Sequence, residues 1–315
     1  MTLSLVIATY NGARFLREQL DSIYQQTHLP DEVVVCDDGS TDGTVAILEE
    51  YKQRYGLIYA VNKQSLGVNG NFFKAMALCT GDVISICDQD DIWFPNKLEV
   101  LCAHMATMDM RKPCVVSSLR QDINAGGEVF SVVHAPYTEG WAATLLTYSR
   151  NQGCTMLFNR ALLDILLPTI YQVENSLTAL YYDEWIAYAG ALLGEKHNLP
   201  DVLMNYRHHD KNTVDGAIHY GHLTFRQKVH YLPTFYGFIP DERFVPLEIV
   251  YRTYQSSITD LEVLDCLDKI CRCNTMVNPF RKLGVILTIR CLPWHKKIII
   301  AVKSTLSITL KAIFE

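Results

Sequence analysis

Short apolar runs alternate with amphipathic stretches through the first third of the chain. Buried strands are predicted by four apolar, β-branched runs, at residues 3–8, 32–36, 57–61 and 83–87. The stretches between them place apolar residues at helical spacing, which predicts helices at residues 13–26, 45–55 and 70–79. Strands and helices that alternate in this way are typical of an α/β fold with a doubly wound, mostly parallel sheet.

The pattern changes in the rest of the chain. Two further strands, separated by a hairpin-like turn at residues 122–127, are predicted at residues 113–118 and 129–133. Residues 195–202 are expected to form a loop and a short strand. Helical periodicity with proline breaks returns at residues 223–231, 244–254 and 258–271. We therefore expect a helical C-terminal extension that follows the α/β part in the chain.

Three carboxylates stand where the run Val83–Cys87 ends, at Asp88, Asp90 and Asp91. Strand ends of this kind are where open α/β sheets place their ligands. Pro95 fixes φ for the first turn of a following helix, so the acids are held in a tight strand-to-helix turn. Like charges this close require a compensating cation, and an oxygen-rich site suits Mg²⁺ or Mn²⁺. The alternative is a solvated acidic turn in which one aspartate caps the helix.

The tail from Phe280 alternates basic and apolar residues, with almost no acids before Glu315. A basic amphipathic segment of this kind can lie on an anionic membrane surface. The alternative is a helix that packs on its own domain or on another subunit, which leaves a homo-oligomer open.

Composition narrows the partners and the compartment. The net charge of −6 over 315 residues argues against nucleic acid as a partner. The chain begins with a strand pattern instead of a signal peptide, and its cysteines lie mostly in apolar runs, as expected for a reducing cytosol. Cys271 and Cys273 lack a second pair at zinc-site spacing. Because no apolar run reaches the ~20 residues of a membrane-spanning helix, we expect a cytoplasmic protein, with peripheral attachment to the inner face of the plasma membrane left open.

Three ordered motifs carry a resemblance to a known family. They are Ser4-Leu-Val-Ile-Ala-Thr-Tyr-Asn-Gly12, Asp37-Asp-Gly-Ser-Thr-Asp42 and Asp88-Gln-Asp-Asp-Ile-Trp93. In this order they resemble the family 2 glycosyltransferases, which have the GT-A fold. The resemblance implies a nucleotide-sugar donor, a divalent metal and inversion at the anomeric carbon.

The family's first two motifs hold the nucleotide, and this implies nucleotide contacts at Thr9, Tyr10, Asn11 and Asp38, with Asp88 at the same sheet edge. The Asp38 carboxylate can accept a hydrogen bond from the N3–H of a uracil or thymine ring. Its alternative role is that of a carboxylate at a helix N-terminus, favoured by the helix dipole.

The third motif implies that Asp90 holds the metal with the help of Asp88 and Asp91, and that Asp91 also lies toward the diphosphate. Farther along, residues 203–214 resemble the Tyr-Arg-x-His-x-x-Asn segment of rhamnosyltransferase-like members. Its polar residues fall at Arg207, His209 and Asn212. His209 is expected to be a third metal ligand or to contact the diphosphate, Arg207 to neutralise the leaving group, and Asn212 to lie toward the substrate. His208 stands where glutamine is common, so which histidine acts stays open.

The acceptor side is implied by two segments. Residues 181–187 resemble the family's Asp-x-Trp at the start of the acceptor-site helix, so Asp183 is predicted to deprotonate the acceptor hydroxyl. Glu184 is the competing carboxylate, and Asp183 as a helix cap is the alternative. Trp185 is either an apolar wall for a sugar or a core tryptophan.

Residues 151–160 resemble the segment that places small residues against the donor sugar and acceptor, here Gly153 and Cys154. A missing Cβ at Gly153 allows close approach of a ligand. The alternative is a strand bulge.

Together these features predict a GT-A chain in three parts. Residues 1–105 form the nucleotide-sugar-binding half, residues 106–215 the acceptor-binding half, and residues 216–315 a helical region for membrane-surface or subunit contact. The predicted activity is transfer of L-rhamnose from dTDP-rhamnose to a sugar hydroxyl of a lipid-linked bacterial polysaccharide such as O-antigen, capsule or cell-wall glycan. The alternatives are transfer of another hexose from a UDP-sugar, and a non-catalytic sugar-binding or scaffold subunit.

Overall fold

The computed structural model describes residues 1–132, 134, 137–139, 152–170, 181–210, 212, 249–261, 263–265 and 267–269. The chain forms two compact units, Met1–Asn212 and Thr213–Glu315. Each unit is described by itself below.

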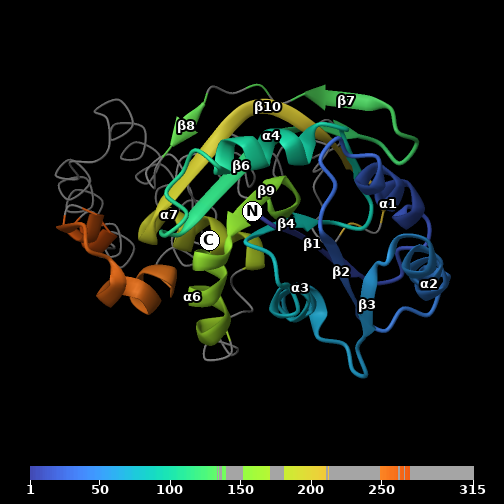
Figure 1. Ribbon diagram of the computed structural model, residues 1–315, viewed down its shortest axis with the longest axis horizontal. Helices are drawn as coiled ribbons and strands as arrows, with labels where there is room; N and C mark the ends of the chain where they lie inside the picture. The colour runs from blue at the N-terminus through green and yellow to red at the C-terminus, as the bar shows by residue number, and fades with distance from the viewer. Residues whose placement is uncertain are drawn as a thin grey trace, which may run out of the picture. The chain divides into compact units, whose positions relative to one another are not determined.

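The first unit is built on one sheet, whose N-terminal part is parallel (Figure 1). Its strands follow the spatial order β3-β2-β1-β4 and comprise β1 (Leu3–Thr9), β2 (Glu32–Asp37), β3 (Ile58–Val61) and β4 (Val83–Cys87). All three neighbouring pairs in this set run parallel. The predicted alternation of strand and helix is therefore confirmed, and the carboxyl ends of these strands meet at one edge.

The C-terminal half of the unit extends the same sheet. β9 (Met156–Asn159) lies antiparallel between β4 and β6 (Cys114–Ile123). β10 (Glu195–Arg207) runs parallel to β6, and β5 (Ile92–Trp93) pairs with it antiparallel. The predicted halves thus share one continuous sheet.

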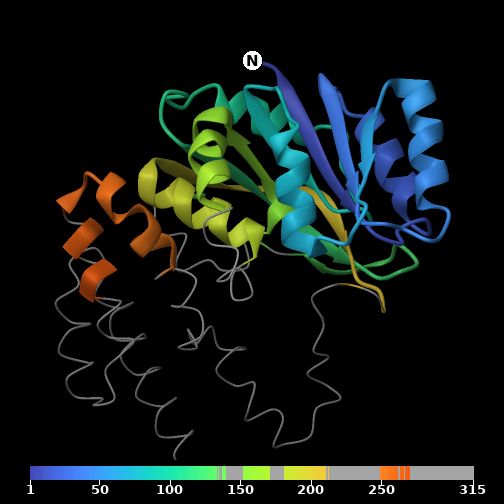
Figure 2. The same cartoon turned by 90° about the horizontal axis from the view of Figure 1, so that it is seen from below.

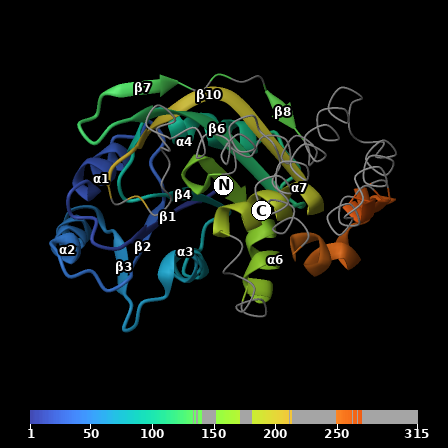
Figure 3. The ribbon, with the colours of Figure 1, turned by 180° about the vertical axis from the view of Figure 1, so that it is seen from behind.

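Two short strands lie beside the long pair β6 and β10 (Figure 3). β7 (Val129–Val132) pairs antiparallel with β6 and completes the predicted hairpin, and β8 (Thr138–Glu139) pairs antiparallel with β10.

Residues 195–202 differ from the prediction of a loop and a short strand, because they begin the 13-residue strand β10. Its pairing with β6 is interrupted between Asn198 and Val202, and the exposed Pro200 lies inside this interruption. Proline has no N–H for the ladder, so a break in register lets the strand continue past it.

Helices cover both faces of the sheet. They are α1 (Leu16–Tyr24), α2 (Thr44–Tyr55), α3 (Gly67–Ala77), α4 (Lys97–Met105), α6 (Arg160–Ile170) and α7 (Tyr182–Leu193). α3, α6 and α7 contact one another along one face (Figure 2). The buried side chains of α1, α2 and α4 belong to the core cluster of the other face.

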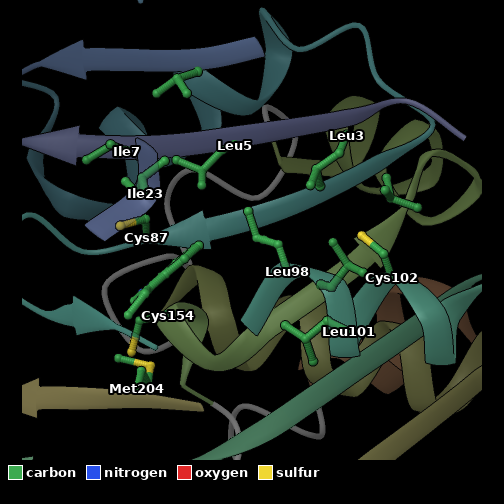
Figure 4. Packing of buried hydrophobic residues seen from close by; sticks show 14 of the residues in the cluster. Leu3, Leu5, Ile7, Ile23, Cys87, Leu98, Leu101, Cys102, Cys154 and Met204 are labelled. Carbon is green, nitrogen blue, oxygen red and sulfur yellow. The ribbon is translucent and has the colours of Figure 1, made fainter. Parts of the chain in front are cut away.

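That core cluster explains how the site edge is supported (Figure 4). Alternate residues of β1, namely Leu3, Leu5 and Ile7, are fully buried in it. The same cluster includes Cys87 and Cys154, which border the acidic turn. Apolar packing therefore extends from the middle of the sheet to the strand ends that carry the acids. The described cysteines, all free and buried, are Cys36, Cys79, Cys87, Cys102, Cys114 and Cys154.

In the second unit, residues 249–254 are helical and lead into the 3₁₀ turn Gln255–Ser257. Residues 263–265 and 267–269 are helical as well, within the ranges where helices were expected. The predicted helix at residues 223–231 and the basic tail from residue 280 lie outside the described residues. A bilayer-spanning helix would need more length and apolar surface than any helix in the described ranges has.

Candidate active site

The loop after β1 is held by the loop after β2. Asn11 has φ of 47°, a left-handed conformation in which asparagine is tolerated. Its N–H donates to Ser40 Oγ at 2.8 Å, and its Oδ1 accepts from Thr41 N–H at 2.9 Å. Thr9 Oγ1 donates to Asp37 Oδ2 at 2.7 Å, whereas Tyr10 is 57% exposed. The exposed ring of Tyr10 is therefore accessible to a ligand, whereas the Thr9 side chain is engaged within the protein.

Asp38 is enclosed by donors from its own chain. Its carboxylate accepts hydrogen bonds from Asn62 Nδ2 at 2.8 Å, Ser65 Oγ at 2.6 Å, Leu66 N–H at 2.7 Å and Gly67 N–H at 3.0 Å. Burial by itself would raise the pKa of Asp38, but these hydrogen bonds outweigh it and the pKa is lowered. The side chain thus ties the end of β2 to the start of α3. A contact with a nucleobase stays a prediction, and it would have to replace one of these donors.

The acids after β4 have different surroundings. Asp91 is fully buried; its Oδ1 accepts from Arg207 N–H at 3.0 Å, and its Oδ2 has no hydrogen-bond partner among the described residues. Burial and the charge of Asp90 raise the pKa of Asp88 to about 7. Burial and both neighbouring acids raise the pKa of Asp91 well above its usual range. The turn therefore holds negative charge that the described protein groups compensate only in part.

This turn fits a divalent cation. One ligand atom each from Asp88, Asp91 and Cys154 lie within 4.8 Å of one another. Asp90 Oδ2 lies 2.7 Å from Nε2 of His209, so the two predicted ligands from distant parts of the chain meet. Carboxylate and imidazole ligands suit Mn²⁺, and a buried, unpartnered carboxylate oxygen is the kind of atom that a cation satisfies. Cys154 was predicted as a substrate residue, and its closeness to the acids was not foreseen.

The geometry separates the two histidines. His209 meets Asp90, whereas Nε2 of His208 lies 3.3 Å from Asp122 Oδ1 on β6. Asn212 closes the turn that presents His209, because its Oδ1 accepts His209 N–H at 2.6 Å and its Nδ2 donates to Arg207 O at 2.9 Å. His209 is thus the histidine that the fold brings to the acidic turn.

Arg207 is 2% exposed, and its guanidinium is occupied within the protein. It donates to the carbonyl oxygens of Asp90 at 2.9 Å and Ala125 at 3.1 Å, and to Glu18 Oε2 at 2.5 Å. These contacts fix the acidic turn against α1 and the β6–β7 turn. The role of Arg207 in neutralising the charge of a leaving group stays a prediction. In the structure its guanidinium stabilises the position of the acidic turn.

Asp183 is the second residue of α7 and is partly buried. It accepts hydrogen bonds from Glu184 N–H at 2.8 Å and from Gly153 N–H at 3.2 Å. Burial and the charge of Glu184 outweigh these bonds and raise the pKa of Asp183 to about 7, with Asp88 contributing further. Glu184 instead accepts from Tyr181 N–H at 3.4 Å, so it makes the reciprocal contact at the helix start.

The acceptor-side neighbours are tightly packed. A Cβ at Gly153 would lie 2.3 Å from the Tyr182 hydroxyl, so the glycine makes room for that side chain. Gly153 begins a 3₁₀ turn, Gly153–Thr155, and not a strand bulge. Trp185 is fully buried, which favours the core tryptophan over a wall in contact with a sugar.

Comparison with known sequences decides the family. The profile described as glycosyl transferase family 2 matches residues 4–166, which include the first three motifs and the Gly153 segment. The chain belongs to glycosyl transferase family 2. The predicted membership is confirmed.

Two curated relatives and one solved structure illustrate its similarities. An uncharacterized glycosyltransferase of Nostoc sp. is 28% identical over 222 residues, 67% of this chain and 66% of the relative. The dTDP-rhamnosyl transferase RfbG of Shigella flexneri is 38% identical over 100 residues, 30% of this chain and 34% of the relative. The matches thus cover less than two thirds of either relative's length. TarS of S. aureus, in a complex with UDP-GlcNAc, has a TM-score of 0.60 at 18% identity, covering 92% of this chain and 77% of that one. This likeness confirms the GT-A fold.

The sequence of this family 2 chain did not lead us to predict a role for Lys97. Lys97 is fully buried, and its Nζ donates to Cys154 O, lies 3.3 Å from Met204 Sδ and 3.6 Å from the Trp93 ring centroid. Burial lowers the pKa of Lys97 to about 8. A basic residue in the first turn of a helix opposes the helix dipole. This unusual position, at the first residue of α4, could have indicated that Lys97 has a role near the acidic turn.

Proposed function

We propose that this family 2 protein is an inverting glycosyltransferase that moves a sugar from a nucleoside-diphosphate donor to a hydroxyl of a saccharide acceptor. The observation that carries the proposal is Asp183, a partly buried carboxyl whose pKa is raised to about 7 within the electrostatic reach of Asp88. A base with a pKa near the working pH is well suited to take a proton from an attacking hydroxyl. The N–H groups of Gly153 and Glu184 hold both of its oxygens in place.

The acidic turn supports the donor side of the proposal. Asp90, Asp88 and His209 would hold Mn²⁺ or Mg²⁺, with the unpartnered Asp91 oxygen close by. The bound cation would offset the charge of the diphosphate leaving group. Arg207 keeps this turn oriented through its contacts with Asp90 O and Glu18.

The nucleotide would bind along the loops after β1 and β2. Tyr10 offers an exposed ring for a base, and Thr9, Asn11 and Asp38 keep the two loops in a fixed arrangement. Loops that are held in place before a ligand binds lose less conformational entropy on binding.

For the donor sugar we propose L-rhamnose from dTDP-rhamnose, with a UDP-sugar as the alternative. Support for the first comes from the Arg207–Asn212 segment and from the similarity to RfbG, named a dTDP-rhamnosyl transferase. Support for the second comes from the TarS structure, which holds UDP-GlcNAc. Because sugar specificity rests on a few pocket contacts, a direct comparison of donors is needed.

For the acceptor we propose a lipid-linked bacterial surface polysaccharide, approached from the cytoplasmic membrane face through the basic tail. Co-sedimentation of the full chain with anionic vesicles tests the tail, because deletion of residues 280–315 should abolish the binding. Equal binding by both forms would remove the membrane role.

The deciding experiment offers dTDP-rhamnose, UDP-GlcNAc, UDP-glucose and UDP-galactose with Mn²⁺ or Mg²⁺ and a rhamnose- or hexose-terminated acceptor. We expect release of nucleoside diphosphate with one donor above all, and a product of inverted anomeric configuration by NMR. Sugar binding without turnover for every donor and acceptor would instead support the non-catalytic subunit. A product with retained configuration would contradict the single-displacement mechanism.

A further inference from the structure

The side chain of Gln89 joins the two loops that the proposed function assigns to nucleotide and cation. Its Oε1 accepts from Tyr10 N–H at 3.0 Å, and its Nε2 donates to Tyr10 O at 3.2 Å. A side-chain amide that pairs with both backbone groups of one residue imitates the pairing of a neighbouring strand. The last β1–β4 pair is Ile7 with Cys87, so Gln89 continues the connection beyond the end of the ladder.

Gly12 provides the space for this amide. A Cβ at Gly12 would lie 2.2 Å from Gln89 Oε1 and 2.6 Å from Gln89 Cδ. The backbone of Gly12 is outside the left-handed region that disfavours other residues, since positive φ values occur elsewhere, at Gly39, Gly56, Gly67 and Gly127. The glycine is therefore explained by the amide packed against it and not by the local backbone conformation.

The rest of this loop is held from the opposite side. Asn11 bonds to Ser40 and Thr41, and Gly12 N–H donates to Thr44 Oγ1 at 2.9 Å. The loop at residues 9–12 is thus fixed by the β2 loop on one side and by Gln89 on the other. Gln89 stands between Asp88 and Asp90, so a shift of the Tyr10 backbone and a shift of the acids are mechanically connected.

We infer that Gln89 is a positioning residue that couples nucleotide binding at residues 9–12 to cation binding at residues 88–91. The inference rests on the proposed function. Coupling between two sites is reciprocal: if Mn²⁺ strengthens nucleotide binding by some factor, the nucleotide strengthens Mn²⁺ binding by the same factor. The charge of a bound cation would supply part of that factor, and the geometry fixed through Gln89 would supply the rest.

The test measures binding of UDP and dTDP to the full chain by titration calorimetry, with and without Mn²⁺. The ratio of the two Kd values is the coupling factor. Gln89→Met keeps the side-chain volume and removes both hydrogen bonds, and we expect it to reduce the coupling factor roughly tenfold. Gly12→Ala keeps the glutamine at position 89, but the added Cβ would displace its amide from Tyr10. We therefore expect the same reduction of the coupling factor. The matched control is Gln53→Met, at an exposed position of α2 where the amide bonds only to Glu49 among the described contacts.

The outcomes separate the two levels of the proposal. If the wild type binds neither nucleotide, the proposed function fails and the inference with it. If the wild type binds with a clear Mn²⁺ dependence and both variants keep its coupling factor, the inference alone is overturned. If Gln89 had only a structural role, its replacement would weaken nucleotide binding equally with and without Mn²⁺. The ratio of the two Kd values would then stay unchanged, and this result would also overturn the inference. Support requires that Gln89→Met and Gly12→Ala lower the ratio and that the double variant lowers it no further, because both remove one interaction. If Gln89→Met does not fold, Gly12→Ala decides alone.

Discussion

Aspartates at the ends of two strands of the same sheet have opposite surroundings. Asp38, after β2, accepts hydrogen bonds from four protein groups, and its pKa is lowered. Asp91, after β4, is fully buried with one oxygen unpartnered, and its pKa is raised. Since the residue type is the same, the difference lies in the donors that the chain supplies. The β2 end is complete without a ligand, whereas the β4 end gains from a cation or a proton.

The same contrast distinguishes acids with a structural role from acids with a proposed catalytic or metal-binding role elsewhere in the site. Asp183 resembles Asp88, because burial and a nearby acid raise its pKa to about 7 despite two N–H donors. Perturbed acids of this kind cluster at functional sites. The three predictions that follow remove one acid at a time: two acids whose pKa is raised, Asp183 and Asp91, and one whose pKa is lowered, Asp38.

The largest effect is expected for Asp183→Asn. The amide keeps the shape and can still accept from Gly153 N–H, but it cannot take a proton, so transfer should fall by roughly 10²–10⁴-fold. Nucleotide binding should be unchanged in calorimetry, because Asp183 makes no contact with residues 9–12 in the described structure. The control is Asp164→Asn on an exposed position of α6, which should keep full activity. Unchanged turnover in Asp183→Asn would move the base to Glu184 or elsewhere.

The second effect is on stability. Asp38→Ala leaves Asn62, Ser65 and the N–H groups of Leu66 and Gly67 without their acceptor. Each hydrogen bond to a charged group contributes about 1.5–3 kcal/mol. We expect the free energy of unfolding in urea to fall by about 3 kcal/mol at pH 7. Because folding lowers the pKa of Asp38, its contribution is complete above the unfolded value of about 3.9 and is lost as the pH falls further. A loss below about 0.5 kcal/mol would mean that the carboxylate is not the anchor of this loop.

The smallest effect is expected for Asp91→Asn, measured in metal-free protein. Asparagine keeps an acceptor for Arg207 N–H and removes a buried charge beside two other acids. Because folding raises the pKa of Asp91, the charged form opposes folding above the unfolded value. The variant should therefore be as stable as the wild type at pH 8, or more stable by about 1 kcal/mol, and the gain should disappear toward pH 4. A destabilisation as large as that of Asp38→Ala would erase the proposed difference between the two strand ends.

The sequence predicted the N-terminal half of the fold well, because each strand and helix there is a local pattern of its own residues. β10 was underestimated because Pro200 suggests a break, and only long-range pairing with β6 carries the strand past it. β9 was not predicted, since its four residues acquire their meaning from pairing with β4 and β6.

For the site, the strand ends singled out the acids, and the family resemblance pointed to one of two histidines, of which the structure brings His209 to Asp90. The sequence did not show which of these side chains are buried or which are already hydrogen-bonded within the protein. Arg207 was expected to face the leaving group, yet it is buried and its guanidinium is occupied by protein acceptors. Trp185 was left open between a sugar wall and a core residue, and its full burial favours the core. Lys97 and Gln89 were missed because their importance depends on what packs against them, at Cys154 O and at Gly12.

The measurement that tests the central claim most directly is the pH dependence of kcat/KM for sugar transfer in the wild type and in Asp183→Asn. A base is active when deprotonated, so the raised pKa of Asp183 predicts that the rate is constant above about pH 7 and falls about tenfold per pH unit below it. The low residual rate of Asp183→Asn should show no break near pH 7. A wild-type profile that stays flat down to pH 5, or a break that persists in Asp183→Asn, would contradict the assignment of Asp183 as the base.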